Sequence, residues 1–176
     1  KTADFTNSDE IHDYAVRALA FDNQFFDKER GLWRDARSTD NAPSYPMRWC
    51  HGAPGIIMAQ YDSSDYKQQN DFLGTLAKRI IVSPLDSSDC LCHGTLGNWL
   101  ALKNILSSYE KDAAASDQYL RRVISRIRSE GAKSGILSGQ LDSVGLMLGE
   151  SGWLTALLIK LDPSIPNPLL LELPTS

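Results

Sequence analysis

This chain has little cysteine, no excess of positive charge and no long apolar run. Each of these absences argues against one class of protein. Its three cysteines cannot all pair, which argues against a disulfide framework and for a reducing compartment. No run of about 18 apolar residues that would cross a membrane occurs, and no secretory signal opens the chain. The formal net charge of −4 gives no sign of a nucleic-acid partner. We therefore expect a cytoplasmic protein without a membrane span.

Positive charge does gather in one segment, which holds four arginines at helical spacing: Arg121, Arg122, Arg126 and Arg128. Acidic neighbours and this spacing favour the solvated outer face of a helix over a contact with nucleic acid. The length of 176 residues suits one compact domain or part of a larger one.

Two short motifs carry the chemistry. They are Trp49-Cys50-His51-Gly52-Ala53-Pro54-Gly55 and Cys92-His93-Gly94-Thr95-Leu96-Gly97, and each places a thiol and an imidazole directly before Gly-x-x-Gly. Cys50, Cys92 and His93 make a soft nitrogen and sulfur ligand set of the kind zinc prefers. Three protein ligands would leave a fourth tetrahedral position open, as a catalytic zinc requires. Thiol addition and hydrolysis both remain open on these residues alone.

Hydrophobic periodicity predicts two kinds of helix. An apolar stripe on one side, which is typical of surface helices, runs along residues 8 to 26, 66 to 82 and 116 to 129. An apolar surface almost all round indicates buried helices, and it occurs in the segments that start at Gly55, Gly97 and Gly149. The stretch from Gly31 to Arg48 has neither period and is expected to form a long loop. Prolines from Pro163 onward predict an extended tail.

The chain also repeats internally. The segments that begin at His51, His93 and Leu148 superpose without gaps, at spacings of 42 and 55 residues, about the length of a helical hairpin. The third copy has Met147 and Leu148 where the second has Cys92 and His93, so Gly-x-x-Gly is architectural and the ligands are an addition to two copies. Alternation of buried and amphipathic segments predicts an all-α fold with an inner and an outer layer of helices.

Three further residues are weaker candidates. Cys90 has no counterpart in the first copy, and we interpret it as a bystander. His51 matches His93 in the repeat, but a fourth protein ligand would close the site, so we expect a supporting or substrate-facing role and name it the catalytic candidate. His12 is expected to be a surface histidine. The alternative to a metal site is a pair of buried cysteines acting as small hydrophobes, and their matching repeat positions argue against it.

At its two Cys-His motifs the sequence resembles the lanthionine synthetase cyclase family. The form Cys92-His93-Gly94-Thr95-Leu96-Gly97-Asn98 and the proline-rich tail are most similar to the C-terminal cyclase domain of class II, bifunctional lanthipeptide synthetases. The resemblance implies an α/α toroid with zinc held by Cys50, Cys92 and His93. It also implies a dehydrated precursor peptide as substrate, whose cysteine thiol attacks a dehydroalanine or dehydrobutyrine to close a thioether ring.

The sequence departs from this family in two respects. A whole cyclase ring is longer, and the family's acid or base histidine lies upstream of the first motif, in a setting unlike that of His12. Residues 1 to 176 are therefore expected to be the C-terminal part of a cyclase domain, a poor cyclase alone, with the missing N-terminal part of the same enzyme as a candidate partner. Two alternatives remain: a eukaryotic-type relative acting on glutathione and dehydrated residues, and a zinc-stabilised helical module that binds a partner without catalysis.

Overall fold

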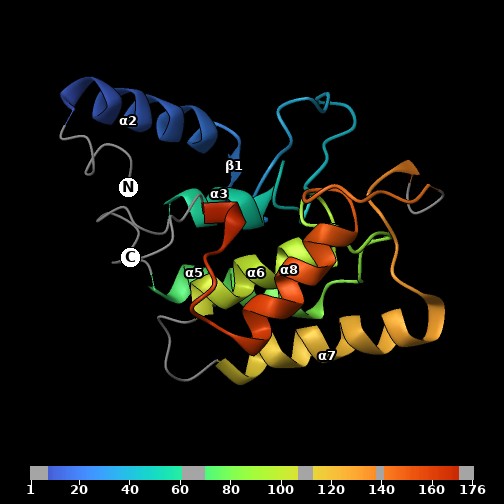
Figure 1. Cartoon of the computed structure of the whole chain (residues 1–176). Helices are drawn as coiled ribbons and strands as arrows, with labels where there is room; N and C mark the ends of the chain where they lie inside the picture. Colours follow the sequence, from blue (N-terminus) through green and yellow to red (C-terminus); the bar gives the residue numbers. More distant parts are fainter. Residues whose placement is uncertain (1–7, 61–69, 107–112, 138–140, 171–176) are drawn as a thin grey trace.

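The computed structural model describes residues 8–60, 70–106, 113–137 and 141–170 (Figure 1). The helices are α2 (Asp9–Asn23), α3 (Ala53–Gln60), α5 (Asn70–Val82), α6 (Thr95–Leu106), α7 (Ala113–Glu130) and α8 (Glu150–Leu161). A 3-10 turn, η2 (Pro168–Leu170), follows α8, and two-residue strands β1 (Phe26–Asp27) and β2 (Leu32–Trp33) form a hairpin. The all-α prediction is confirmed. Within the described ranges no helix is long and apolar enough to span a membrane.

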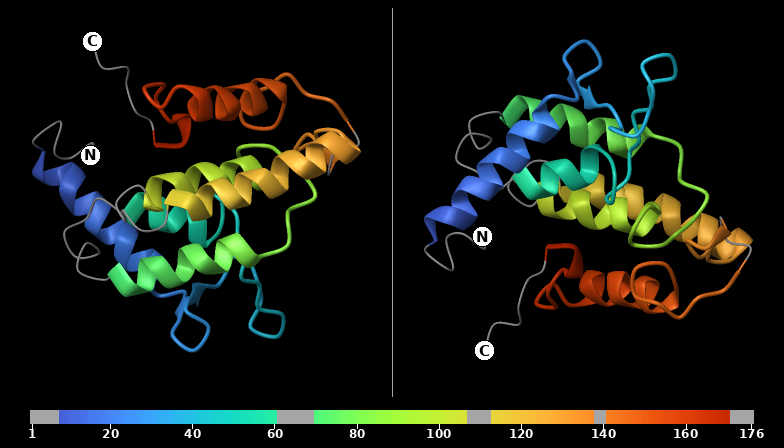
Figure 2. Two further views of the ribbon diagram at one scale, coloured as in Figure 1. Left: turned by 90° about the horizontal axis from the view of Figure 1, so that it is seen from below. Right: turned by 90° about the horizontal axis from the view of Figure 1, so that it is seen from above.

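The helices pack in two rows around α6. Contacts join α3 to α6 and α6 to α8 in one row, and α5 to α7 in the other, while α6 also packs on α5 and α7. Figure 2 shows α8 at one edge of this arrangement and α5 with the β1–β2 hairpin toward the other. Nearly every side chain of α6 is buried, as its all-round apolar sequence predicts. Two concentric layers of alternating helices are the arrangement of an α/α toroid, of which these helices form an arc.

The third apolar helix, α8, is less buried than the sequence predicts. Only Gly152, Ala156 and Ile159 are buried, and the helix that α8 mainly contacts is α6. Four leucines on the other side are exposed: Leu154, Leu157, Leu158 and Leu161. The prediction of a fully buried helix is therefore wrong for α8 in this chain. The physical reason is that α8 lies at the edge of its row and has a neighbour on one side.

Two local predictions for the N-terminal region also need correction. The first helix ends at Asn23 rather than near residue 26, and Phe26 instead pairs with Trp33 across the hairpin. Gly31, at a φ of +60°, turns the chain between the strands, a conformation that glycine adopts without strain. The rings of Phe26 and Trp33 pack against Phe72 of α5, which anchors the hairpin to the helical core. The long loop predicted up to Arg48 follows this hairpin.

The glycine repeat proves to be architectural, as the sequence predicts. A Cβ added to Gly55, Gly97 or Gly152 would lie 1.8, 1.9 or 2.1 Å from the carbonyl oxygen of the residue six positions earlier. In all three copies the chain folds back on itself at the start of an inner helix, and only glycine fits. This shared close approach places the three motifs in the same conformation at one end of α3, α6 and α8.

We expect Gly97→Ala to destabilise the protein, because its Cβ would collide with the backbone of Leu91. Overpacking of this kind costs about 1–3 kcal/mol of unfolding free energy, or more where backbone must move. The matched control is Gly74→Ala, within α5, where an added Cβ meets nothing within 4 Å. Alanine there should stabilise the helix by about 0.5–1 kcal/mol. Urea unfolding of both variants measures the difference, and equal stabilities would contradict the architectural role.

The arginine stripe on α7 is not uniformly solvated. Arg121 and Arg128 are exposed, as predicted, but the guanidinium group of Arg122 donates to the carbonyls of Ile81 and Ser83 at the end of α5. Arg126 donates to the carbonyl of Asp86 and to the carboxylate of Asp89. The prediction of a solvated face is therefore wrong for these two arginines. They bind the segment that leads from α5 into the second Cys-His motif.

Candidate metal centre

The two Cys-His motifs meet through their backbones. The N–H of Cys50 donates to the carbonyl of Cys92 at 3.1 Å, and the N–H of Cys92 donates to the carbonyl of Met147 at 3.0 Å. Cys50, Cys92 and Met147 occupy equivalent positions in the three copies, so the repeats are joined to one another in register. Residues 42 and 55 positions apart in the sequence are thereby brought to one end of the inner row.

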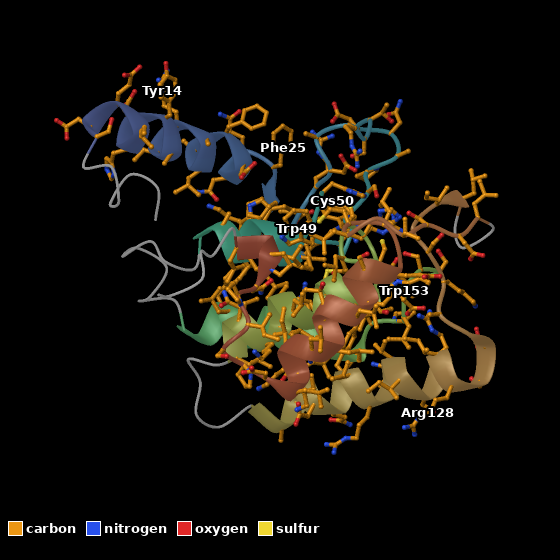
Figure 3. The ribbon with its side chains drawn as sticks, in the orientation of Figure 1. Tyr14, Phe25, Trp49, Cys50, Arg128 and Trp153 are labelled. Carbon is orange, nitrogen blue, oxygen red and sulfur yellow. The ribbon has the colours of Figure 1, made fainter. Side chains whose placement is uncertain are left out.

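This junction gathers the three predicted ligands. The sulfur atoms of Cys50 and Cys92 and a ring nitrogen of His93 all lie within 4.8 Å of one another. Cys50 is exposed, Cys92 and His93 are half-buried, and all three cysteines of the chain are free thiols. Figure 3 shows Cys50 next to Trp49, below the long loop and close to the start of α3. The cluster can therefore hold a metal ion at a place that solvent reaches.

The donor set fits zinc. Burial raises the pKa of the Cys92 thiol to about 12, and a hydrogen bond with Cys50 and the neighbouring sulfur atoms act in the same direction. Without a cation this thiol keeps its proton at neutral pH, because no positive charge compensates a buried thiolate. A bound divalent cation supplies that charge and releases the proton. Two thiolates and an imidazole form a ligand set that zinc favours over harder cations such as magnesium.

The structure places His51 against a ligand candidate rather than among them. Its Nδ1 lies 2.7 Å from the sulfur of Cys50, so this nitrogen is engaged in a hydrogen bond with the thiol. Partial burial lowers the pKa of His51, and the guanidinium groups of Arg37 and Arg48 lower it further. His51 is therefore a neutral imidazole at neutral pH. Its position beside Cys50 is compatible with the supporting or substrate-facing role expected from the sequence.

The other two candidates lie outside the cluster. Cys90 is fully buried, and its sulfur contacts the hydroxyl of Ser88 at 3.3 Å and accepts the backbone N–H of His93 at 3.4 Å. Its side chain thus supports the turn that carries His93. His12 lies exposed on α2, a helix without a single buried residue. Neither residue belongs to the group of three atoms that can share one ion.

An open pocket of about 480 Å³ adjoins the cluster, with Cys50 and His51 in its wall. Aromatic rings form much of the rest, contributed by Phe21 near the end of α2, by Phe25 just after this helix and by Trp49. The loop from Arg34 to Arg37 closes one side, where the Arg37 guanidinium pairs with the carboxylate of Asp35 and holds its pKa well below the usual range. The pocket beside the Cys–Cys–His cluster thus combines aromatic surface with a few charged groups, a lining that is common in ligand-binding sites.

Sequence reasoning missed Asp89, which positions the second motif. Its side chain is 0% exposed and accepts from the Thr95 hydroxyl at 2.7 Å, the Lys133 N–H at 2.9 Å and the guanidinium group of Arg126. These contacts tie the start of α6, the end of α7 and the segment after it to the residue that precedes Cys90. Its role carried no signal in the sequence, because its partners Arg126 and Lys133 lie 37 and 44 residues away along the chain.

Asn98 is a second missed residue. Its amide donates to the carbonyl of Met47 at 2.6 Å and so fastens the first motif to α6. Asn98 was noted in the sequence as part of the second motif, and the contact that it makes with the first lies 51 residues away along the chain. Local pattern contains no information on that partner.

The two-layer helical fold and the Cys–Cys–His cluster are the features that the family resemblance of the sequence implies, and comparison with known proteins shows the family. The family model described as lanthionine synthetase C-like protein matches residues 1–171. This chain therefore belongs to the lanthionine synthetase C-like family. It is 30% identical over 148 residues to the lacticin 481/lactococcin biosynthesis protein LcnDR2 of Lactococcus lactis subsp. lactis. That alignment covers 74% of this chain and 16% of the relative, so the chain spans a small part of the relative's length. No solved structure matches the chain.

Proposed function

We propose that this chain carries the metal centre of a zinc-dependent cyclase that forms thioether rings in lantibiotic biosynthesis. The observation that carries the proposal is the solvent-exposed Cys50 within a Cys–Cys–His cluster at the wall of an open pocket. A structural zinc is enclosed by four protein ligands, whereas three ligands leave a position for a substrate thiol. Family membership and the relative named for lacticin 481/lactococcin biosynthesis support a peptide substrate.

Each residue of the site has a role in this reaction. Cys50, Cys92 and His93 would hold the zinc, which when bound would lower the pKa of a coordinated thiol so that it is ionised at neutral pH. The substrate sulfur forms a bond to the β-carbon of a dehydroalanine or dehydrobutyrine as the carbon–carbon double bond gives way to an enolate, and one proton, equivalent to the one lost by the thiol, is added at the α-carbon. His51 is the candidate of this chain for proton transfer, because it lines the pocket beside Cys50.

The pocket also suits the peptide that must be held there. Phe21, Phe25 and Trp49 offer apolar surface for side chains next to the reacting cysteine. Binding those side chains would keep the thiol and the dehydrated residue together, and such positioning supplies much of the acceleration in ring-closing reactions.

We further propose that residues 1–176 form the C-terminal part of a larger cyclase domain in a cytoplasmic enzyme. The relative is several times longer than the aligned region, and α8 leaves four leucines uncovered at the edge of the inner row. The remaining part of the same enzyme would then be a partner of this chain and would supply the general acid. A positioned acid contributes about 10²- to 10⁴-fold to rate, so this chain alone should be a slow cyclase.

The test is ring closure on a dehydrated peptide that contains one cysteine and one dehydroalanine. We expect slow loss of the free thiol with the zinc-loaded protein, and a rate at the uncatalysed background after chelation or with Cys92→Ala. Equal rates with and without zinc would contradict the proposal. Addition of glutathione to the same peptide, without ring closure, would instead favour the eukaryotic-type activity.

A further inference from the structure

The third repeat lacks a cysteine and a histidine, yet its backbone reaches the metal cluster. Leu148, which stands where His93 stands in the second copy, accepts the N–H of Gly135 through its carbonyl at 2.7 Å. Gly135 belongs to the segment between α7 and α8, and its own carbonyl lies 3.2 Å from Nε2 of His93. The third copy is thus connected to a ligand candidate through one intervening peptide.

This contact determines which nitrogen of His93 is protonated. A carbonyl oxygen only accepts hydrogen bonds, so Nε2 must carry the hydrogen that it donates to Gly135. In a neutral imidazole the other nitrogen, Nδ1, then has the free lone pair. Histidines that bind metals commonly donate their second ring N–H to a carbonyl or carboxylate, which fixes the orientation of the ring.

The Gly135 carbonyl is itself held in place from three sides. The Gly135 N–H donates to the carbonyl of Leu148. Two residues earlier, the Lys133 carbonyl accepts the Asp89 N–H and the Lys133 N–H donates to the Asp89 carboxylate. Underneath lies Cys90: a Cβ added at Gly135 would be 2.7 Å from the sulfur of Cys90 and 3.0 Å from a methyl of Leu148. Only glycine can approach this closely. The side chain of Cys90 cannot easily move aside, because its sulfur already contacts the Ser88 hydroxyl and the N–H of His93.

We propose that the Gly135 carbonyl, seated on Cys90 and on the third repeat, orients His93 so that Nδ1 is its metal-binding atom. The ligand-free copy therefore contributes to the metal centre through its backbone. Gly135 is a positioning residue in this scheme, and Cys90 is the support that sets its distance from His93. The inference rests on the proposed zinc centre and specifies how one of its ligands is presented.

The first test uses the unaltered zinc-loaded protein labelled with ¹⁵N in its histidines. Two-bond ¹H–¹⁵N correlation spectra distinguish a metal-bound ring nitrogen from a protonated one. For His93 we expect Nδ1 to be bound to zinc and Nε2 to carry a hydrogen. Zinc bound through Nε2 would overturn the inference without affecting the proposed cyclase function. Zinc bound through Nδ1 in a protein that closes no rings would overturn the function and leave the inference supported.

The second test measures zinc affinity by competition with a chromophoric chelator. Gly135→Ala should weaken binding about 10- to 100-fold, the usual cost of losing a group that orients a ligand. The matched control is Gly145→Ala in the same segment, where the added Cβ meets a single atom, the Ser143 hydroxyl oxygen at 3.4 Å. Its affinity should equal that of the parent protein.

A compensating change separates this role from general destabilisation. Cys90→Ala removes the sulfur that an alanine at position 135 would strike, and leaves contacts of 3.0 Å or more. The double variant Gly135→Ala, Cys90→Ala should therefore regain most of the affinity and the Nε2–H signal of His93. Undiminished affinity of Gly135→Ala, or no recovery in the double variant, would overturn the proposed support by Cys90 and Gly135.

Discussion

Cys92→Ala should deprive the protein of its metal. We expect close to one equivalent of zinc in the parent protein and little in Cys92→Ala, Cys50→Ala or His93→Ala, because each removes one of the three atoms that lie within 4.8 Å of one another. Two remaining ligands do not hold zinc in competition with water and buffer, so the loss should exceed the 10- to 100-fold typical of residues that merely orient a ligand. Elemental analysis of protein prepared without chelators gives the zinc content directly.

His51→Ala and Cys90→Ala are the matched controls for this experiment. Each removes an imidazole or thiol that lies next to the cluster in sequence, yet each should still bind one equivalent of zinc when zinc is in excess, with a weaker affinity in Cys90→Ala because its sulfur supports Gly135. Nδ1 of His51 contacts the Cys50 sulfur, and the Cys90 sulfur faces Ser88 and the N–H of His93. Loss of zinc from either variant would indicate a closed site with four protein ligands. That result would favour a structural zinc module over catalysis.

X-ray absorption spectroscopy at the zinc edge of the zinc-loaded protein gives an independent check of the same ligand set. Distances of about 2.3 Å to sulfur and about 2.0–2.1 Å to nitrogen are expected for tetrahedral zinc. Two sulfur atoms, one nitrogen and one further light atom around the metal would agree with an open position. A shell of protein sulfur and nitrogen alone would not.

Asp89→Asn should cause the largest loss of stability of any single substitution considered in this protein. The change keeps the shape of the side chain but removes the negative charge that faces Arg126, whose guanidinium side chain is only 13% exposed. Burial lowers the pKa of Arg126, because a charge removed from water is less stable. Breaking a buried pair by removing one partner costs about 3–5 kcal/mol of unfolding free energy. Urea unfolding followed by tryptophan fluorescence measures that loss.

The control for this prediction is Asp117→Asn. Asp117 also forms an ion pair, with Lys160, but both side chains are 42% exposed. Solvent screens this pair, so its loss should cost about 0–1 kcal/mol. Adding Arg126→Met to Asp89→Asn should restore part of the stability, because the unpaired charge is then gone. Equal effects of Asp89→Asn and Asp117→Asn would show that the buried pair does not hold the second motif in place.

The helices of this chain were largely predictable, because helix formation follows local periodicity. The inner helices α3 and α6 coincide with segments that are apolar all round, and α5 and α7 with segments that have one apolar stripe. The β1–β2 hairpin was not predicted. Its strands are two residues long, which is too short to show an alternation of apolar and polar residues. Phe72, whose ring packs against the hairpin, lies about 40 residues away along the chain.

The metal cluster was predictable for a different reason. An internal repeat places equivalent residues in equivalent conformations, so Cys50 and Cys92 had to occupy matching turns at the same end of neighbouring helices. The structure bears this out through the hydrogen bonds that join Cys50 to Cys92 and Cys92 to Met147. The roles of the surrounding residues carried no such signal. The sequence pattern placed Arg126 in a solvated stripe, whereas in the structure its guanidinium group contacts the carboxylate of Asp89.

The sequence by itself determined the helical class, the repeat and the three ligand candidates of this protein, since each of these depends on spacing along the chain. The tertiary structure alone decided the environment of those ligands. Asp89 meets Arg126, His93 meets Gly135, and Cys50 meets its pocket through contacts between segments that are distant in sequence. Such contacts depend on how helices pack against one another, and packing is a property of the whole fold that no local pattern specifies.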